Sequence, residues 1–190
     1  MQSERQKWNA RYQSSLVDRL EADTYLIEGY TRFVSPLFPR QGRALDLAGG
    51  MGRHAIWLAR QGWNTTLLDI SPVALDAARK WSSGEHLWLE FVEADLDDYP
   101  LPEEAFNLIT VFGFLQRSLF LALQQCLRPG GIVIYKTRMR ATTDEAHGTL
   151  DYLLHPGELP HIFSGFGILD YRTGIGPRGS TAALVARKPL

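Results

Sequence analysis

The chain has 190 residues, of which 45% are hydrophobic, which is enough for one well-buried domain and leaves little for a second. Its formal net charge of -1 gives no overall attraction to nucleic acid or to anionic membranes, so neither is expected as a partner. The single cysteine excludes a disulfide framework and a multi-cysteine metal site, and no metal is expected. The chain has no apolar signal core and no apolar stretch of about 20 residues, so we expect a cytoplasmic protein.

The first region, residues 4–33, is polar with large apolar side chains three to five positions apart, a spacing that favours helices. Aromatic stripes at helical spacing usually belong to a core, so one interpretation is that Trp8 and Tyr12 pack these helices on the domain. Prolines and a glycine break the chain before the first strand. We predict a single domain, residues 1–190, with a helical cap or lid over residues 1–40 and a core over residues 43–190.

A glycine-rich stretch, residues 43–71, has the pattern of the first half of a mononucleotide-binding fold. The apolar run at residues 44–48 predicts a strand, the glycines after it predict a tight loop, and the apolar spacing that follows predicts a helix. A second strand, residues 65–68, ends at Asp69, about 20 residues after the glycines. Glycines let a ligand approach the backbone closely, and an acid at this position can accept hydrogen bonds from both ribose hydroxyls.

Two classes of nucleoside cofactor satisfy this geometry. Gly50, Gly52 and Ala55 match the nicotinamide fingerprint G-x-G-x-x-G/A, so a dinucleotide-dependent oxidoreductase is one hypothesis. A chain of this length has no room for the substrate domain that dehydrogenases normally add, which counts against that hypothesis. The remaining segments decide between the two classes.

The rest of the chain alternates in the order of an α/β domain. Ser71 and Pro72 form a helix start, because the serine hydroxyl can cap exposed N–H groups and proline suits the first helical position. These patterns predict a three-layer α/β/α Rossmann-like fold with a mostly parallel seven-stranded sheet and an antiparallel last strand. The expected elements are a helix to about residue 81, strands at 87–92, 106–112 and 132–135, helices at 115–127 and near 156, and a closing hairpin at 165–171 and 182–187.

Four segments resemble class I S-adenosylmethionine-dependent methyltransferases of the small-molecule kind. Residues 45–53, an acid followed by a glycine-rich loop, are similar to that family's first motif, and residues 68–72 are similar to its second. Residues 93–96 are similar to its adenine-binding step, and residues 127–131 to the turn before its fifth strand. The last two segments have no counterpart in the nicotinamide fingerprint.

Within that family, residues 8–12 and 115–117 most resemble the tellurite-resistance and thiopurine type of enzyme. The sequence departs from the family pattern at two positions. The first loop glycine is Ala48 here, the smallest possible substitute, so we expect cofactor binding to survive. The acid often found before the fourth strand is Asn107, which we expect to affect packing more than chemistry.

The resemblance implies that the chain binds S-adenosyl-L-methionine and releases S-adenosyl-L-homocysteine. It places the methionyl end at the glycine loop, the ribose at Asp69, and the adenine between Ile70 and the acid of residues 93–96. The acid of the first motif would orient the loop, and the end of the fourth strand would wall the ligand or pack in the core. The predicted cofactor-binding residues are Asp46, Ala48, Gly49, Gly50, Gly52, Asp69, Ile70, Asp95, Leu96 and Phe112.

By the same resemblance, the N-terminal cap covers the cofactor and helps to form the acceptor pocket. The polar segment after the fifth strand is expected to be a loop over the site, where a basic pair could hold an anionic substrate, although surface charges are usually solvated. The substrate candidates are Trp8, Arg11, Phe114, Arg138 and Arg140, and the candidates for a general base are Tyr12 and His147.

The reaction implied is in-line displacement at the sulfonium methyl, for which alignment and exclusion of water are the main requirements. A thiolate or a metalloid oxyanion would need no base, whereas an amine or hydroxyl would. No Asn/Asp-Pro-Pro-Tyr/Phe signature of nucleic-acid aminomethyltransferases is present, so a small-molecule acceptor is expected, with the protein a monomer or homodimer. Two alternatives stay open: a nicotinamide-dependent reductase, and a non-catalytic S-adenosylmethionine-binding protein.

Overall fold

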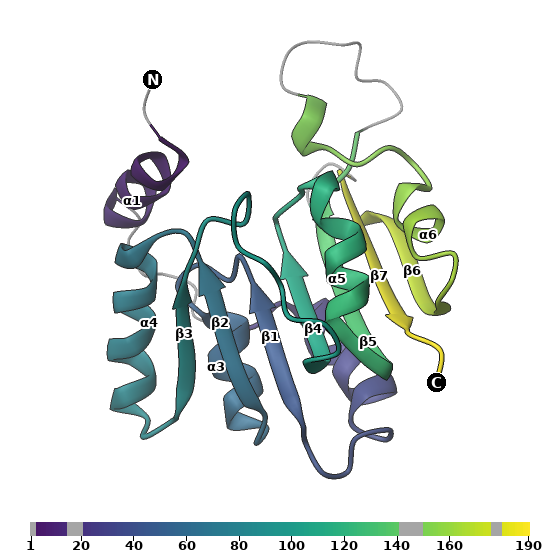
Figure 1. Ribbon diagram of the computed structural model, residues 1–190, viewed down its shortest axis with the longest axis horizontal. Helices are drawn as coiled ribbons and strands as arrows, with labels where there is room; N and C mark the ends of the chain where they lie inside the picture. Colours follow the sequence, from purple (N-terminus) through teal and green to yellow (C-terminus); the bar gives the residue numbers. More distant parts are fainter. Residues whose placement is uncertain (1–2, 15–20, 141–149, 176–179) are drawn as a thin grey trace.

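The computed structural model describes residues 3–14, 21–140, 150–175 and 180–190. Its centre is a seven-stranded sheet in the order β3-β2-β1-β4-β5-β7-β6. The strands are β1 Arg43–Leu47, β2 Asn64–Asp69, β3 Leu89–Glu93, β4 Phe106–Phe112, β5 Leu127–Arg138, β6 Gly167–Ile175 and β7 Thr181–Arg187. The strands from β3 to β5 pair in parallel, and β7 pairs antiparallel with both β5 and β6 (Figure 1). The predicted sheet, with an antiparallel last strand, is confirmed.

Helices cover both faces of the sheet, which gives three layers (Figure 1). They are α2 Thr24–Gly29, the π-helix η1 Tyr30–Val34, α3 Arg53–Arg60 and α4 Pro72–Gly84 on one face, and α5 Phe120–Cys126 and α6 Glu158–Ile162 on the other. Neighbouring strand residues alternate between the two cores, so Ala44 packs with α2 and η1 while Leu45 packs with α5. Burial on both faces explains why the parallel strands read as continuous apolar runs.

The N-terminal region, which was predicted to form one helical cap, consists of two parts. It contains α1 (Glu4–Ser14), which lies above α4 in the view of Figure 1, and then α2 and η1, which pack on the back face of the sheet in that view. The helix α1 contributes no buried residue, whereas Tyr25, Leu26, Tyr30 and Val34 of α2 and η1 belong to the core. The two parts therefore have different roles: α2 and η1 complete the core, and α1 lies outside it.

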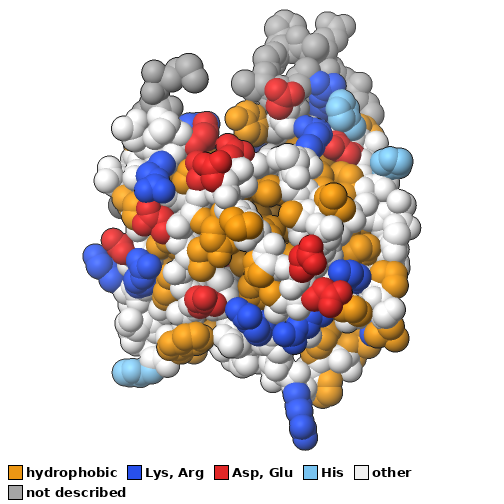
Figure 2. All heavy atoms as spheres, in the orientation of Figure 1, with side chains coloured by type: hydrophobic (Ala, Val, Ile, Leu, Met, Phe, Trp, Pro, Cys, Tyr) orange, Lys and Arg blue, Asp and Glu red, His pale blue; other side chains and the backbone are white. Residues whose placement is uncertain are grey.

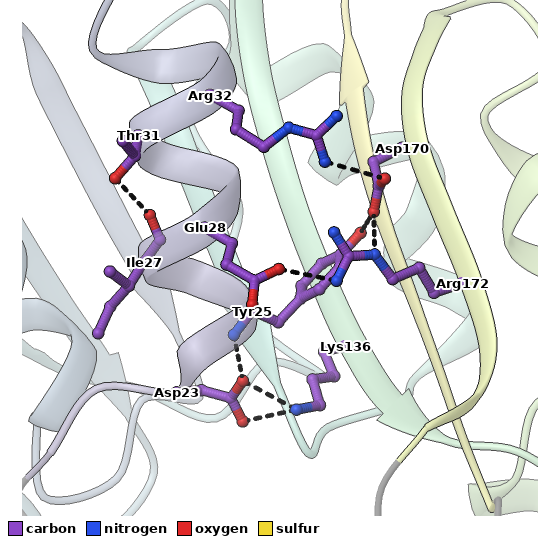
Figure 3. Close-up of polar contacts among 9 residues, drawn as sticks. All are labelled: Asp23, Tyr25, Ile27, Glu28, Thr31, Arg32, Lys136, Asp170 and Arg172. Atoms are coloured by element: carbon purple, nitrogen blue, oxygen red, sulfur yellow. Dashed lines mark hydrogen bonds and ion pairs between the residues drawn. The ribbon is translucent and has the colours of Figure 1, made fainter.

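Polar contacts fix α2 and η1 to the antiparallel edge of the sheet (Figure 3). Lys136 Nζ of β5 lies 2.8 Å from both carboxylate oxygens of Asp23, the N-cap of α2. The Tyr25 hydroxyl donates to Asp170 of β6 at 3.0 Å, and Arg172 of β6 pairs with Glu28 at 2.8 Å. These contacts join α2, β5 and β6, which are far apart in the sequence.

Two predicted elements were wrong in extent. The strand expected at residues 132–135 is the twelve-residue β5, which includes the Pro-Gly-Gly segment expected as a turn and runs on to Arg138, expected as loop. The strand extends to Arg138 because residues 132–138 pair with β7, whereas residues 128–131 pair with neither β4 nor β7 and form an irregularity within the strand. The helix expected at residues 115–127 begins only at Arg117, with a 3-10 turn, η2 Arg117–Leu119, before α5. Gln116 has extended backbone angles, and its side-chain amide donates to Asp97 in the loop after β3 at 2.8 Å.

The helix that starts at Ser71 is confirmed, with the Ser71 hydroxyl accepting from the Ala74 N–H at 3.2 Å, and it runs to Gly84, three residues past the prediction. The short helix α6 near residue 156 and the closing hairpin are also confirmed. No helix among the described residues is long and apolar enough to cross a membrane.

Candidate functional site

A cavity of about 810 Å³ opens at the carboxyl ends of β1, β2 and β4, the edge at which ligands dock on open α/β sheets. Its walls come from α1, the loop between β1 and α3, the residues after β2, β3 and β4, and the 3-10 turn η3 (Leu150–Tyr152). Figure 2 shows apolar side chains gathered in the middle of one face of the molecule, with charges of both signs around them. The cavity is lined by residues of the N-terminal helix α1 and by residues of the α/β core.

The glycine loop is shaped for close approach. Gly50 and Gly52 have φ angles of 57° and 79°, and Gly52 is the N-cap of α3, with no side-chain cap. A Cβ on Gly49 would lie 2.4 Å from Asp46 Oδ2, and one on Gly50 would lie 2.5 Å from the Tyr12 hydroxyl. A side chain at Gly50 would therefore fill the space between the loop and the cap, whereas one at Gly49 would collide with Asp46 beneath the loop. Ala48 also has a positive φ, 52°, which glycine adopts without strain.

Asp46 is fully buried beneath this loop and lines the cavity. Its carboxylate accepts from the Thr110 hydroxyl of β4 at 2.8 Å and from the Ala55 N–H of α3 at 3.1 Å. Burial nevertheless raises the pKa of Asp46 to about 7. Asp46 therefore joins β1, β4 and α3, and a cation in the cavity would stabilise its ionised form.

Asp69, at the end of β2, is held by two backbone amides. Gly50 N–H donates to Oδ2 at 2.7 Å and Ser71 N–H donates to Oδ1 at 2.9 Å. Burial raises the pKa of this carboxyl, and the amides of Ser71, Gly50 and Ile70 oppose that shift. The acid is thus fixed against the glycine loop, and its carboxylate lines the cavity beside Ile70.

The cap helix α1 closes one side of the cavity with Trp8, Arg11 and Tyr12. Its contacts with the core are polar: Asn9 Oδ1 accepts from the Ser71 hydroxyl at 2.6 Å, and Arg5 pairs with Glu93 at 2.7 Å. The Trp8 and Tyr12 rings stack at 5.9 Å, and the Arg11 guanidinium lies 5.1 Å from the Trp8 ring. Burial, followed by the charge of Asp69, raises the pKa of the Tyr12 phenol. Tyr12 therefore keeps its proton at neutral pH and is a poor general base.

Most of the predicted site residues line this one cavity. Of the cofactor candidates, Asp46, Ala48, Gly49, Gly50, Asp69, Ile70, Asp95, Leu96 and Phe112 do so, as does the substrate candidate Phe114. Gly52 lies behind the loop, where a Cβ would come 2.9 Å from Leu67. Arg138 is the last residue of β5 and Arg140 lies two residues beyond it, and neither is among the described residues that line the cavity. His147 lies outside the described residues.

Among the lining residues that the sequence interpretation missed are Arg53, His54 and Tyr152. Arg53 and His54 directly follow Gly52, the last glycine of the loop. Their position at the start of a helix could have identified them, but the sequence interpretation considered only the glycines. His54 is 2% exposed, with its ring centroid 4.2 Å from that of Phe112, and burial, then the charge of Arg53, lowers its pKa to about 3. No local sequence pattern predicts that Tyr152 lines the cavity, because only tertiary packing brings it to the cavity's rim.

Comparisons with known proteins agree with this geometry. Residues 44–131 match the Methyltransferase domain family. The chain is 33% identical over 109 residues to the demethylmenaquinone methyltransferase of Clavibacter sepedonicus, which covers 55% of this chain and 43% of that protein. It is 26% identical over 142 residues to the tRNA 5-carboxymethoxyuridine methyltransferase of Escherichia coli (strain K12), which covers 70% of this chain and 52% of that protein. The chain spans about half the length of these curated relatives.

Among solved structures, TehB from Haemophilus influenzae has a similar fold, with a TM-score of 0.77 and 17% identity over 88% of this chain and 62% of TehB. S-adenosylmethionine-dependent methyltransferases are also among the similar structures. At these identities the likeness shows the fold alone. Residues 44–131, a little under half of the chain, are thus similar to a methyltransferase domain, and the fold is one that S-adenosylmethionine-dependent methyltransferases share. The finer placement in the tellurite-resistance and thiopurine type stays a prediction.

Proposed function

We propose that the chain is an S-adenosylmethionine-dependent methyltransferase whose acceptor is a small molecule. One observation supports this most directly: the glycine loop and Asp69 form a continuous wall of a cavity at the carboxyl ends of β1 and β2. A nucleoside with an extended side chain requires these two features side by side, because the ribose needs an acceptor and the chain beyond it needs open backbone.

The residues present fit the cofactor along the cavity. The methionyl end would lie on residues 48–50, the ribose at Asp69, and the adenine between Ile70 and the Asp95–Leu96 step. Leu96 is buried and supplies an apolar face, whereas Asp95 is exposed, with one carboxylate oxygen accepting from the Asp97 N–H at 3.1 Å. The other carboxylate oxygen of Asp95 can accept from an exocyclic amine.

The bound cofactor supplies a methyl group already activated by its positive sulfonium. The protein's own contribution is to align the acceptor, hold the cofactor's ends and keep water out, and α1 with its aromatic side chains covers the cavity for that purpose. Since Tyr12 holds its proton, an acceptor that is already anionic or soft, such as a thiolate or a metalloid oxyanion, suits the described lining best. His147 stays a candidate base for other acceptors.

A small acceptor is favoured over nucleic acid on charge. Acidic and basic side chains are mixed on the face in Figure 2, with no extended patch of one sign. A nucleic-acid interface normally presents a basic stripe. The cytoplasmic location and a monomeric or dimeric state belong to the same proposal.

Calorimetric titration with S-adenosylmethionine, S-adenosylhomocysteine, NADH and NADPH tests the cofactor class. We expect micromolar binding of the two sulfur nucleosides and no binding of the nicotinamide cofactors. Binding of NADH or NADPH alone would restore the reductase hypothesis. Methyl transfer is then measured by mass spectrometry with thiols and metalloid oxyanions as first acceptors, and transfer to RNA alone would overturn the small-molecule proposal. Binding without transfer to any acceptor would favour the non-catalytic alternative.

A further inference from the structure

Of the described residues that follow β5, only Tyr152 lines the cavity. It lies in η3 and is 58% exposed, so burial does not fix its side chain. Lys7 Nζ of α1 lies 5.8 Å from the centroid of the Tyr152 ring. Because α1 forms another wall of the cavity, the ring lies at the edge where the walls formed by η3 and α1 meet.

Arg117, in η2, fixes the backbone on both sides of Tyr152. Its Nη1 donates to the Asp151 carbonyl at 2.7 Å, and its Nη2 donates to the Leu153 carbonyl at 3.0 Å. The same guanidinium forms a two-bond pair with Glu158 of α6, with Nε 2.7 Å from Oε1 and Nη2 2.9 Å from Oε2. The planar fork of arginine suits this combination of one carboxylate and two carbonyls. One side chain therefore attaches η3 to both η2 and α6.

The residue after this turn is anchored separately, to the end of β5. Leu154 is fully buried; its N–H donates to the Arg138 carbonyl at 3.0 Å, and its carbonyl accepts from the Arg140 N–H at 2.9 Å. This anchor holds the chain beyond η3, whereas Arg117 binds the carbonyls of the two residues that flank Tyr152. The direction in which the Tyr152 ring points thus depends on Arg117.

We propose that Arg117 is a positioning residue that holds the Tyr152 ring over the edge of the cavity, where the ring slows the release of the bound nucleoside. The proposal rests on the proposed function, which supplies the nucleoside. Arg117 is not among the described residues that line the cavity, so it acts through Tyr152 and takes no part in methyl transfer. A tyrosine ring can cover an apolar or aromatic part of a ligand while its hydroxyl stays in water.

The test is a double-mutant cycle on the rate at which S-adenosylhomocysteine dissociates, measured by surface plasmon resonance. Arg117→Gln and Tyr152→Ala should each raise this rate about 5- to 10-fold, as expected for one lost aromatic contact. Because Arg117 acts through Tyr152, the double variant should dissociate no faster than the faster single variant, within about twofold. A residue that only stabilised the fold would lower the thermal midpoint and leave the effect of Tyr152→Ala unchanged.

Arg117→Lys is a second variant, which keeps the charge but loses the planar fork. It should also raise the dissociation rate, because one ammonium cannot hold both carbonyls and the carboxylate. Arg60→Gln is the matched control, since Arg60 also forms a two-bond pair with an acid, Glu85, and is not among the described residues that line the cavity. It should release the nucleoside at the rate of the unmodified protein, and thermal unfolding without ligand checks that each variant is folded.

Two results would overturn the proposal. The effects of Arg117→Gln and Tyr152→Ala could multiply in the double variant, which would assign the effect of Arg117 to its neighbour Gln116, a residue that lines the cavity. Alternatively, the dissociation rate could stay unchanged in either single variant. If the unmodified protein does not bind S-adenosylhomocysteine at all, the proposed function itself fails, and the role of Arg117 fails with it.

Discussion

At the scale of single residues, the cavity contains a backbone conformation that its side chain does not favour. Ala48 stands where the resembled family has glycine and has a φ of 52°. The left-handed conformation costs a residue with a Cβ about 1–2 kcal/mol. From the sequence, Ala48 was expected to leave cofactor binding intact, and the structure adds strain in the backbone itself.

Replacing Ala48 by Gly should therefore stabilise the fold. Relief of strain exceeds the extra flexibility that glycine gives the unfolded chain, so we expect a gain of about 0.5–1 kcal/mol in the free energy of unfolding. Urea denaturation measures it. Ala77→Gly, inside α4, is the matched control and should lose about 1 kcal/mol. A loss at position 48 as large as that at position 77 would contradict the strain argument.

Asp46 and His54 are buried with opposite pKa shifts, to about 7 and about 3. For Asp46, the folded state binds more protons than the unfolded state between about pH 4 and 7, so its contribution to stability falls as pH rises through that range. For His54, the folded state binds fewer protons between about pH 3 and 6.5, so its contribution rises with pH. Between about pH 4 and 6.5 the two contributions oppose one another.

Single substitutions should separate the pH dependence of the free energy of unfolding that is due to Asp46 from that due to His54. In Asp46→Asn the free energy of unfolding should increase with pH between about 4 and 6.5, and in His54→Asn it should decrease, each by up to about 1.4 kcal/mol per pH unit relative to the unmodified protein. Urea denaturation at three pH values provides the measurement. Parallel slopes in the two variants would show that the residues do not titrate as described.

At the scale of elements, α1 differs from the helices that cover the two faces of the sheet. It has no buried residue and meets the rest of the chain through polar contacts such as Asn9 with Ser71. The ion pair of Arg5 with Glu93 is largely exposed, and such pairs contribute little to stability. Its aromatic side chains line the cavity instead of entering a core.

A variant without residues 1–14 should consequently remain folded but bind ligand poorly. We expect the free energy of unfolding without ligand to change by less than about 1 kcal/mol, because no core contact is lost. The affinity for S-adenosylhomocysteine should fall at least about tenfold, because one wall of the cavity is removed. Trp8→Ala/Tyr12→Ala in the full chain is the companion variant. A truncated chain that unfolds would mean that α1 belongs to the core.

The element scale also shows where sequence patterns were sufficient. The start of α4 was predictable because Ser71 and Pro72 carry the signal locally, and the strands β1 and β2 because their apolar runs are buried on both faces. The length of β5 was not predictable, since it depends on pairing with β7 about 50 residues later. Likewise, Tyr152 reaches the cavity only through tertiary packing, while Arg53 could have been predicted from its place after Gly52.

At the scale of the whole molecule, ligand binding and stability are linked, because the cavity joins α1, the sheet and the rim. S-adenosylhomocysteine at 100 times its dissociation constant should add about 2.7 kcal/mol to the free energy of unfolding. For a chain of this size that raises the thermal midpoint by about 5–10 °C. Asp69→Ala should abolish the shift, as differential scanning fluorimetry can show, because the ribose loses its acceptor. A full shift in this variant would contradict the placement of the ribose.

The position of α1 outside the core has a consequence for how such a protein can diversify. Residues that hold a fold together are constrained by packing, but those of α1 face the cavity and solvent without that constraint. A library randomised at the cavity-facing positions of α1 should therefore contain mostly folded proteins. Changes of acceptor preference can accumulate there one residue at a time, while the sheet below continues to present the same glycine loop and the same acid.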